Sequence, residues 1–394
     1  MRKNILYLLV FFMPIMVFGQ VQKQSGQGEQ FSSIIPTSKQ SLLKDVDVIF
    51  NTRYANVNSF TDGDFVNSAF KMEQFRFEVK GKIHEKVSFR FRNRYTKEPV
   101  PNSYDNFSKA VDLAFINVEL GKKTSLSMGK LCADWGGYEF DFNPIDILTY
   151  NDILENADNF LTGVGINHNL NDKNSFSFQV LNSRSNTLED TYGGSVPAEV
   201  MSAKLPLAFV TNWRGSFFEG KFQTTYSYSF FNEATHTNMN YYVFGNKFKP
   251  NDKFVIYYDL QYSNEALDRL GIVSNIIPAS VDGGAQAQRV EYLENWVRAE
   301  YLISPKINLL LTVMNHNSYW NNNPDPNADD RLETTYGLIP TIQFLPYKDI
   351  NIKFYATFIG RKYDYSNYAE QNYGVKDRTT GQINVGFIAP LLVL

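Results

Sequence analysis

Segments in which apolar and polar residues alternate recur along almost the whole chain. In residues 74–80, QFRFEVK, the side chains of Phe75, Phe77 and Val79 share one face, and charged or amide side chains share the other. Residues 87–95, VSFRFRNRY, alternate in the same way. A period of two is the pattern of a β-strand with two unlike faces. About ten residues per segment also matches a tilted strand that crosses a bilayer.

The connections between these segments alternate in length. Sixteen strands are predicted near residues 46–56, 72–81, 86–96, 110–120, 124–133, 161–169, 174–182, 203–213, 220–231, 238–248, 253–264, 289–302, 306–317, 331–345, 349–361 and 379–394. Short breaks such as 121–123 follow the even-numbered strands, and longer polar stretches such as 57–71 mostly follow the odd-numbered ones. In membrane barrels the short turns lie in the periplasm and the long loops outside. The pattern predicts an all-β fold, a transmembrane antiparallel β-barrel of about sixteen strands, with a secreted soluble all-β protein as the alternative.

Composition agrees with a barrel. Aromatic residues make up 15% of the 394 residues, as expected where aromatic girdles face lipid. Beyond the N-terminal segment, no stretch approaches the roughly 18 apolar residues that a spanning helix needs. Only a closed barrel then satisfies every backbone polar group in a membrane. The formal charge of −3 does not suggest a nucleic-acid partner.

The N-terminal residues predict export. Arg2 and Lys3 precede an apolar run that ends near Gly19, which is the pattern of a cleaved signal peptide over residues 1–19. A polar periplasmic leader is expected over residues 20–44 and the barrel over 45–394. The expected location is the outer membrane of a Gram-negative bacterium, with outer-membrane lipid around the barrel.

The polar strand faces predict a basic wall inside the barrel. Arg or Lys facing lipid at mid-depth costs about 2 to 4 kcal/mol, so charged faces belong to the lumen. The predicted pore-lining basic residues are Arg53, Arg76, Lys80, Arg90, Arg92 and Arg94. As an alternative for any single residue, an aqueous rim and a partner among Glu73, Glu78 and Glu85 remain open.

The loop expected at about 134–160 is acidic. No Lys or Arg occurs between Leu131 and Asp172. The candidate constriction-loop acids are Asp134, Glu139, Asp141, Asp146, Asp152 and Glu155. Pro144 and the apolar spacing after it predict short helix. Folded inward, this third extracellular loop would place its acids opposite the arginines and create a transverse field.

Three stretches resemble a known family. They are GKLCADWGGYEFDFNPIDILTY (129–150), NADNFLTGVGINHNL (156–170) and FSFQVLNS (176–183). They resemble the phosphate-selective porin O and P family, in particular its Bacteroidota members. The resemblance implies a sixteen-stranded outer-membrane porin, usually a homotrimer, whose third loop folds inward. It implies structural motif positions at Gly129, Lys130, Gly136, Gly137, Glu139 and Gly163.

The expected function is passive diffusion of small hydrophilic solutes and ions through a charged constriction. A phosphate- or anion-selective channel is one alternative, since founding members bind phosphate through rows of arginine and lysine, although the loop here is acidic. An outer-membrane hydrolase is the alternative from another class.

No residue pattern predicts catalysis. Cys132 is the only cysteine, and the histidines, His84, His168, His236 and His316, stand at no metal or catalytic spacing with it. No catalytic residue, metal site or cofactor is expected. Loop carboxylates at 61–64, 280–284 and 323–330 could bind calcium, but solvated turns explain them as well.

Overall fold

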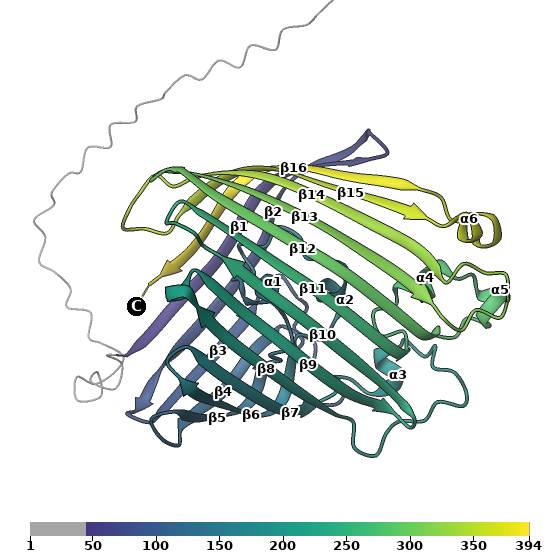
Figure 1. Ribbon diagram of the computed structural model, residues 1–394, viewed down its shortest axis with the longest axis horizontal. Coiled ribbons are helices and arrows are strands. Elements are labelled where there is room, and N and C mark those ends of the chain that lie inside the picture. The colour runs from purple at the N-terminus through teal and green to yellow at the C-terminus, as the bar shows by residue number, and fades with distance from the viewer. Residues whose placement is uncertain (1–44, 394) are drawn as a thin grey trace, which may run out of the picture. The chain divides into compact units, whose positions relative to one another are not determined.

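The computed structural model describes residues 45–393. The predicted signal peptide and periplasmic leader lie outside the described residues. Sixteen antiparallel strands form a closed barrel in which β1 pairs with β16, as predicted (Figure 1). The strands are β1 (Val46–Thr61), β2 (Asp64–His84), β3 (Val87–Arg94), β4 (Val111–Glu119), β5 (Thr124–Cys132), β6 (Phe160–Asn171), β7 (Asn174–Asn182), β8 (Leu207–Phe217), β9 (Phe222–Ala234), β10 (Thr237–Phe248), β11 (Phe254–Leu267), β12 (Gln288–Ser304), β13 (Ile307–Trp320), β14 (Arg331–Phe344), β15 (Lys353–Tyr365) and β16 (Arg378–Leu392).

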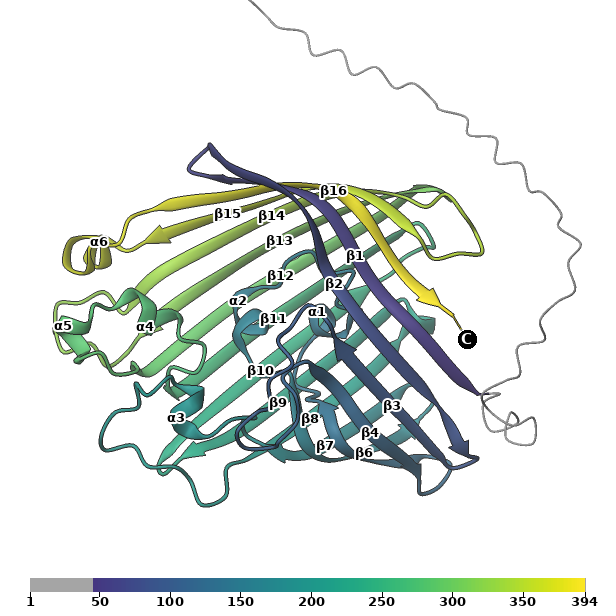
Figure 2. The same ribbon diagram turned by 180° about the vertical axis from the view of Figure 1, so that it is seen from behind.

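The helices are short and lie in the loops. They are α1 (Tyr138–Asp141), α2 (Asp152–Asn156), α3 (Leu188–Thr191), the 3-10 turn η2 (Phe218–Gly220), α4 (Ile272–Ile276), α5 (Ala279–Asp282) and α6 (Asn367–Tyr373). Figures 1 and 2 show α1 and α2 within the barrel, and α3 to α6 with the long loops at one of its ends. Among residues 45–393, no helix has the length and hydropathy needed to cross a bilayer.

The strand faces are inverted relative to a soluble protein. In β7, the outward Phe176 and Phe178 are 42% and 37% exposed, whereas Ser177 between them is 7% exposed. The strand alternates because each successive side chain points to the opposite side of the sheet. The apolar row faces outward and the polar row inward, as in a barrel surrounded by lipid.

The first connection differs from the expected long loop over 57–71. β1 and β2 continue through this stretch as one hairpin, whose turn is Asp62–Gly63 with φ of 51° and 88°. Positive φ at both central positions is the geometry that Asp-Gly favours in two-residue hairpin turns. The hairpin projects past the neighbouring strands in Figures 1 and 2.

Much of the lumen is filled by an apolar core. The loop between β5 and β6, residues 133–159, enters the barrel; we call it the constriction loop. Its Trp135, Ile153 and Leu154 belong to the same buried cluster as Val273 of α4 and Tyr241 of β10. Burial of this apolar surface stabilises the inward fold of the loop.

Candidate functional site: a charged passage

A cavity of about 980 Å³ lies beside the constriction loop. Residues of β1 to β7 and Pro390 of β16 line it together with loop residues, among them 140–144 and 147–150. We call this cavity the passage. It is the candidate route for solutes.

All six predicted basic residues line the passage: Arg53 on β1, Arg76 and Lys80 on β2, and Arg90, Arg92 and Arg94 on β3. We call the five arginines the arginine row. The side chains of Arg90 and Arg94 are 39% and 24% exposed, and the other three arginines are each below 10%. Arg90 and Arg94 therefore present the most accessible cationic groups of the row.

Asp112 lies within the arginine row. Its carboxylate oxygens lie 3.2 Å from Nε of Arg76, 3.2 Å from Nε of Arg92 and 2.8 Å from Nη2 of Arg94. The β3–β4 register shifts beside Asp112, since Arg92 pairs with Leu113 and Asn93 with Val111. A β-bulge of this kind redirects a side chain, which explains how Asp112 reaches the lumen next to Leu113, another lining residue.

Glu73 and Glu78 are the other two carboxylates of the row. Glu73 lies 3.3 Å from Nε of Arg53, at a second register shift where β1 pairs with β2. Glu78 accepts a hydrogen bond from Nε of Arg90 at 2.9 Å. Five arginines and three carboxylates leave a formal charge of +2 on this wall.

The aqueous-rim alternative fits one residue. The side chains of Lys80 and its partner Asp47 are 45% and 49% exposed, with 3.5 Å between Nζ and the carboxylate. Arg53 and Arg90 do pair with Glu73 and Glu78, but they do so inside the passage.

Acids of the constriction loop attach it to the barrel wall. Asp134 and Asp141 both bind Arg214 of β8, which donates to Asp134 at 2.8 Å. Asp146 lies 2.7 Å from Nζ of Lys353 on β15. Arg298 of β12 also donates to the main-chain carbonyl of Asp146 at 3.1 Å.

Glu139 is fully buried at the start of α1 and accepts from the main-chain N–H of Asn151 at 2.8 Å. Burial raises the pKa of Glu139 well above its ordinary value. Next to it, Asp259 accepts from the main-chain N–H groups of Tyr138 at 3.0 Å and Glu139 at 2.7 Å. A Cβ on Gly137 would lie 2.5 Å from the Asp259 carboxylate, so only glycine permits this contact.

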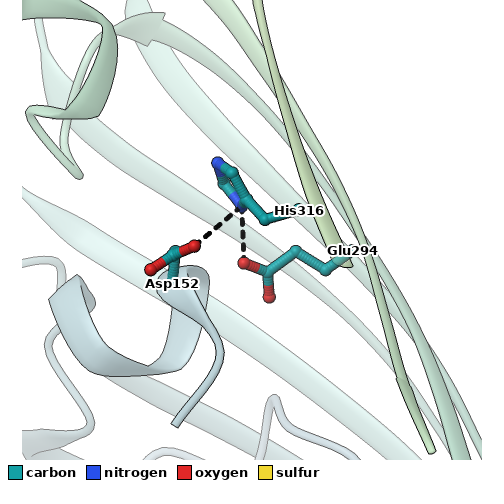
Figure 3. Close-up of side chains that lie close together, drawn as sticks. All are labelled: Asp152, Glu294 and His316. Atoms are coloured by element: carbon teal, nitrogen blue, oxygen red, sulfur yellow. Dashed lines mark hydrogen bonds and ion pairs between the residues drawn. The ribbon is translucent and has the colours of Figure 1, made fainter. Parts of the chain in front are cut away.

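Asp152 begins α2 and belongs to a cluster with Glu294 of β12 and His316 of β13 (Figure 3). Nδ1 of His316 lies 2.6 Å from Glu294 and 4.0 Å from Asp152. One ligand atom from each residue falls within 4.8 Å of the others, which resembles a cation site. Arg361, however, already binds Asp152 at 2.5 Å, and Glu294 also accepts from the N–H of Ile153 at 2.8 Å. These contacts make the cluster an attachment of α2 to the wall.

The loop acids thus depart from the expected arrangement. Asp146 and Asp152 bind Lys353 and Arg361 of β15 and do not line the passage, and Glu139 is buried. Asp134, Asp141 and Glu155 do line the passage, although Arg214 already binds the first two. The loop therefore places less negative charge opposite the arginine row than its composition predicted.

The remaining motif positions are structural. Gly129 has φ of 129°, and a Cβ there would lie 2.2 Å from the carbonyl oxygen of Ala114 on β4. Gly163 and Gly136 are similarly confined, by Val180 and Phe140. Nζ of Lys130 lies 3.4 Å from Asp105 and attaches the β3–β4 loop to the wall.

Several residues of the site were missed by sequence reasoning: Asp112 beside the arginine row, and Arg214, Arg298, Lys353 and Arg361, which bind the constriction loop. Glu73 was expected only as a partner at an aqueous rim. Arg298, Lys353 and Arg361 lie at inward positions of strands that the sequence predicted. Their charge at such positions could have identified them as residues of the lumen. Cys132 lines the passage, and its carbonyl accepts from Nε2 of Gln179 at 3.1 Å. The calcium prediction stays a prediction.

Comparisons with known proteins agree with this geometry. The family model described as phosphate-selective porin O and P matches residues 50–387. Among curated proteins, no match was found.

Solved structures show the same fold. The outer membrane channel DcaP of Acinetobacter baumannii has a TM-score of 0.57 at 13% identity, covering 87% of this chain and 96% of its own. An anion-selective porin from Comamonas acidovorans has a TM-score of 0.56 at 11% identity, covering 88% and 98%. OmpT of Vibrio cholerae has a TM-score of 0.53 at 9% identity, covering 88% and 97%.

The matched family covers most of the chain, and the sixteen-stranded barrel encloses a passage lined by charged residues. The chain belongs to the phosphate-selective porin O and P family, and it is a porin of the Gram-negative outer membrane through which small solutes diffuse.

Proposed function

We propose that this porin prefers small anions. The observation that carries the proposal is the arginine row, whose five arginines and three carboxylates leave a formal charge of +2 along the passage. Low-dielectric walls focus the field of such charges on a permeating ion. Cations of the barrel compensate four of the loop acids: Lys353 binds Asp146, Arg361 binds Asp152, and Arg214 binds Asp134 and Asp141. Glu155 also lines the passage and opposes the field of the arginines.

The mechanism is size exclusion combined with electrostatic filtering, with no chemical step. The constriction loop sets the width, since its attachments to β8, β12 and β15 hold it across the lumen. Export through the N-terminal signal peptide and assembly as a homotrimer complete the proposal.

Phosphate selectivity is the second candidate, favoured by the family match and by the close spacing of Arg76, Arg92 and Arg94 around Asp112. Asp112 argues against it, because its charge already compensates part of the cluster. Phosphate that blocked chloride current at far lower concentration than acetate would favour this candidate.

Planar-bilayer recording of the purified protein tests the main proposal. Stepwise conductance in groups of three, with a reversal potential shifted toward chloride in a KCl gradient, is the expected result. An ion-impermeable protein, or a channel that prefers potassium, would contradict it.

A further inference from the structure

The two walls of the passage differ in chemistry. One wall carries the arginine row. The constriction loop contributes five half-buried apolar or aromatic side chains to the lining, together with the acids Asp134, Asp141 and Glu155. The five are Phe140, Phe142, Pro144, Leu148 and Tyr150.

The folding of the loop explains its apolar inner face. Asp146 and Asp152 bind Lys353 and Arg361 of β15. The carboxylates of Asp146 and Asp152 are thereby kept out of the passage lining, whereas Asp134, Asp141 and Glu155 belong to it. A small inorganic anion gains no binding free energy from these apolar side chains, because it has no apolar surface to remove from water.

The apolar face is held in place from behind. Phe142 packs edge-on against Tyr257 at 5.0 Å between ring centroids, and the Arg298 guanidinium lies 4.4 Å from the Phe142 ring. The Tyr150 carbonyl accepts from Nη1 of Arg361 at 3.4 Å. A surface fixed in this way loses little conformational freedom when a solute binds to it.

The passage already contains one pairing of cation and ring. The guanidinium carbon of Arg92 lies 5.2 Å from the centroid of Phe160, where β6 begins. A solute with both an anionic group and a ring therefore fits this environment: its carboxylate can bind Arg90 or Arg94, the most accessible of the row, through paired N–H donors. Its ring then contacts the loop.

We propose that the passage selects organic anions that carry one carboxylate on an apolar, ring-sized body over smaller anions of the same charge. This inference rests on the proposed anion preference and adds the solute class. Phe142 and Leu148 are assigned to the ring, and Arg90 and Arg94 to the carboxylate.

The test compares benzoate, acetate and phosphate as blockers of chloride current through the full-length porin in planar bilayers at pH 7. Benzoate is expected to reach half-block at a concentration at least tenfold below that of acetate, and below that of phosphate. Benzyl alcohol, which has the ring without the charge, is expected to block weakly.

Two variants separate the contributions of the walls. Phe142→Ser with Leu148→Ser is expected to reduce the benzoate-to-acetate ratio to threefold or less. Arg90→Ala with Arg94→Ala is expected to weaken block by both carboxylates. Met201→Ser, at a 65% exposed residue of the β7–β8 loop, is the matched control and is expected to keep the wild-type ratio.

The outcomes distinguish this inference from the proposed function. Equal block by benzoate and acetate in a chloride-preferring wild-type channel overturns the inference alone, as does strongest block by phosphate. A wild-type channel that prefers cations overturns the proposed function as well. Since the wild-type comparison needs no variant, misfolding of a loop variant does not remove the test.

Discussion

Replacing Arg90, Arg92 and Arg94 by alanine is expected to reverse the charge of the arginine row. Two arginines, Arg53 and Arg76, then face three carboxylates, so the formal charge changes from +2 to −1. Anions lose stabilisation in the passage, and cations gain it.

The size of the effect follows from Coulomb's law. One charge about 7 Å from a monovalent ion contributes about 0.6 kcal/mol at the dielectric constant of water. Screening at 0.1 M salt reduces this to about 0.3 kcal/mol. Three charges then change the anion and cation energies by about 1 kcal/mol each, in opposite directions. The chloride-to-potassium permeability ratio is expected to fall about twentyfold, since about 1.4 kcal/mol corresponds to a factor of ten.

The assay is the reversal potential of the purified porin in a KCl gradient. Lys122→Ala, Lys123→Ala and Lys173→Ala together form the matched control, because these exposed lysines of two short turns carry the same charge. Asp112→Asn is expected to act in the opposite direction and raise chloride preference, since it removes a carboxylate from the row. An unchanged reversal potential in the arginine variant, or an equal shift in the lysine variant, would refute the reasoning.

Three further predictions concern the constriction loop and its neighbourhood. Arg361→Met removes the guanidinium that lies 2.5 Å from the Asp152 carboxylate. Larger fluctuations of the channel current and faster proteolysis within the constriction loop are expected. Unchanged recordings would show that this attachment of the loop is dispensable. Because the folded pKa of Glu139 is raised, the neutral form favours the folded state, and stability is lost as pH rises from the ordinary value of 4.5 toward the raised folded value. Glu139→Gln, which cannot ionise, is therefore expected to flatten the fall in unfolding temperature over this pH range, as measured by the heat-dependent shift in gel mobility; an equally steep fall in the variant would show that other groups cause it. Gly129→Ala is expected to lower stability by at least about 2 kcal/mol through its clash and strained φ, whereas Gly121→Ala, with open space around it, is not; equal mobility shifts for the two would contradict the steric argument.

The fold was predictable because its signal is local. Alternation within each strand identifies the lipid-facing residues, and the sorting of short and long connections fixes the strand number. The hairpin of β1 and β2 was missed because residues 57–71 are mostly polar. A polar composition is also typical of a loop, so it did not indicate that the strands continue. The sequence Asp62–Gly63 is typical of a two-residue hairpin turn, and it could have been used to extend the predicted bounds of both strands.

The partners of the site were less predictable. A sequence shows that Asp146 and Asp152 are acidic, but the path of the loop decides which strand each one meets, and Lys353 and Arg361 lie about two hundred residues away. The inward position of Asp112 could not be predicted for another reason. Strict alternation puts it and Leu113 on opposite faces, and the bulge that brings Asp112 inward has no clear mark in the sequence.

The arginine row has a consequence for how selectivity is encoded. Its five cationic side chains all come from β1, β2 and β3, a continuous stretch of residues 46–94. One of them also holds the constriction loop, since Nη1 of Arg53 donates to the main-chain carbonyls of Ile145 and Ile147. Arg53 therefore links charge preference to width, and its replacement is expected to change both. Arg90 and Arg94 pair instead with Glu78 and Asp112, so they can be replaced while these loop contacts stay as they are.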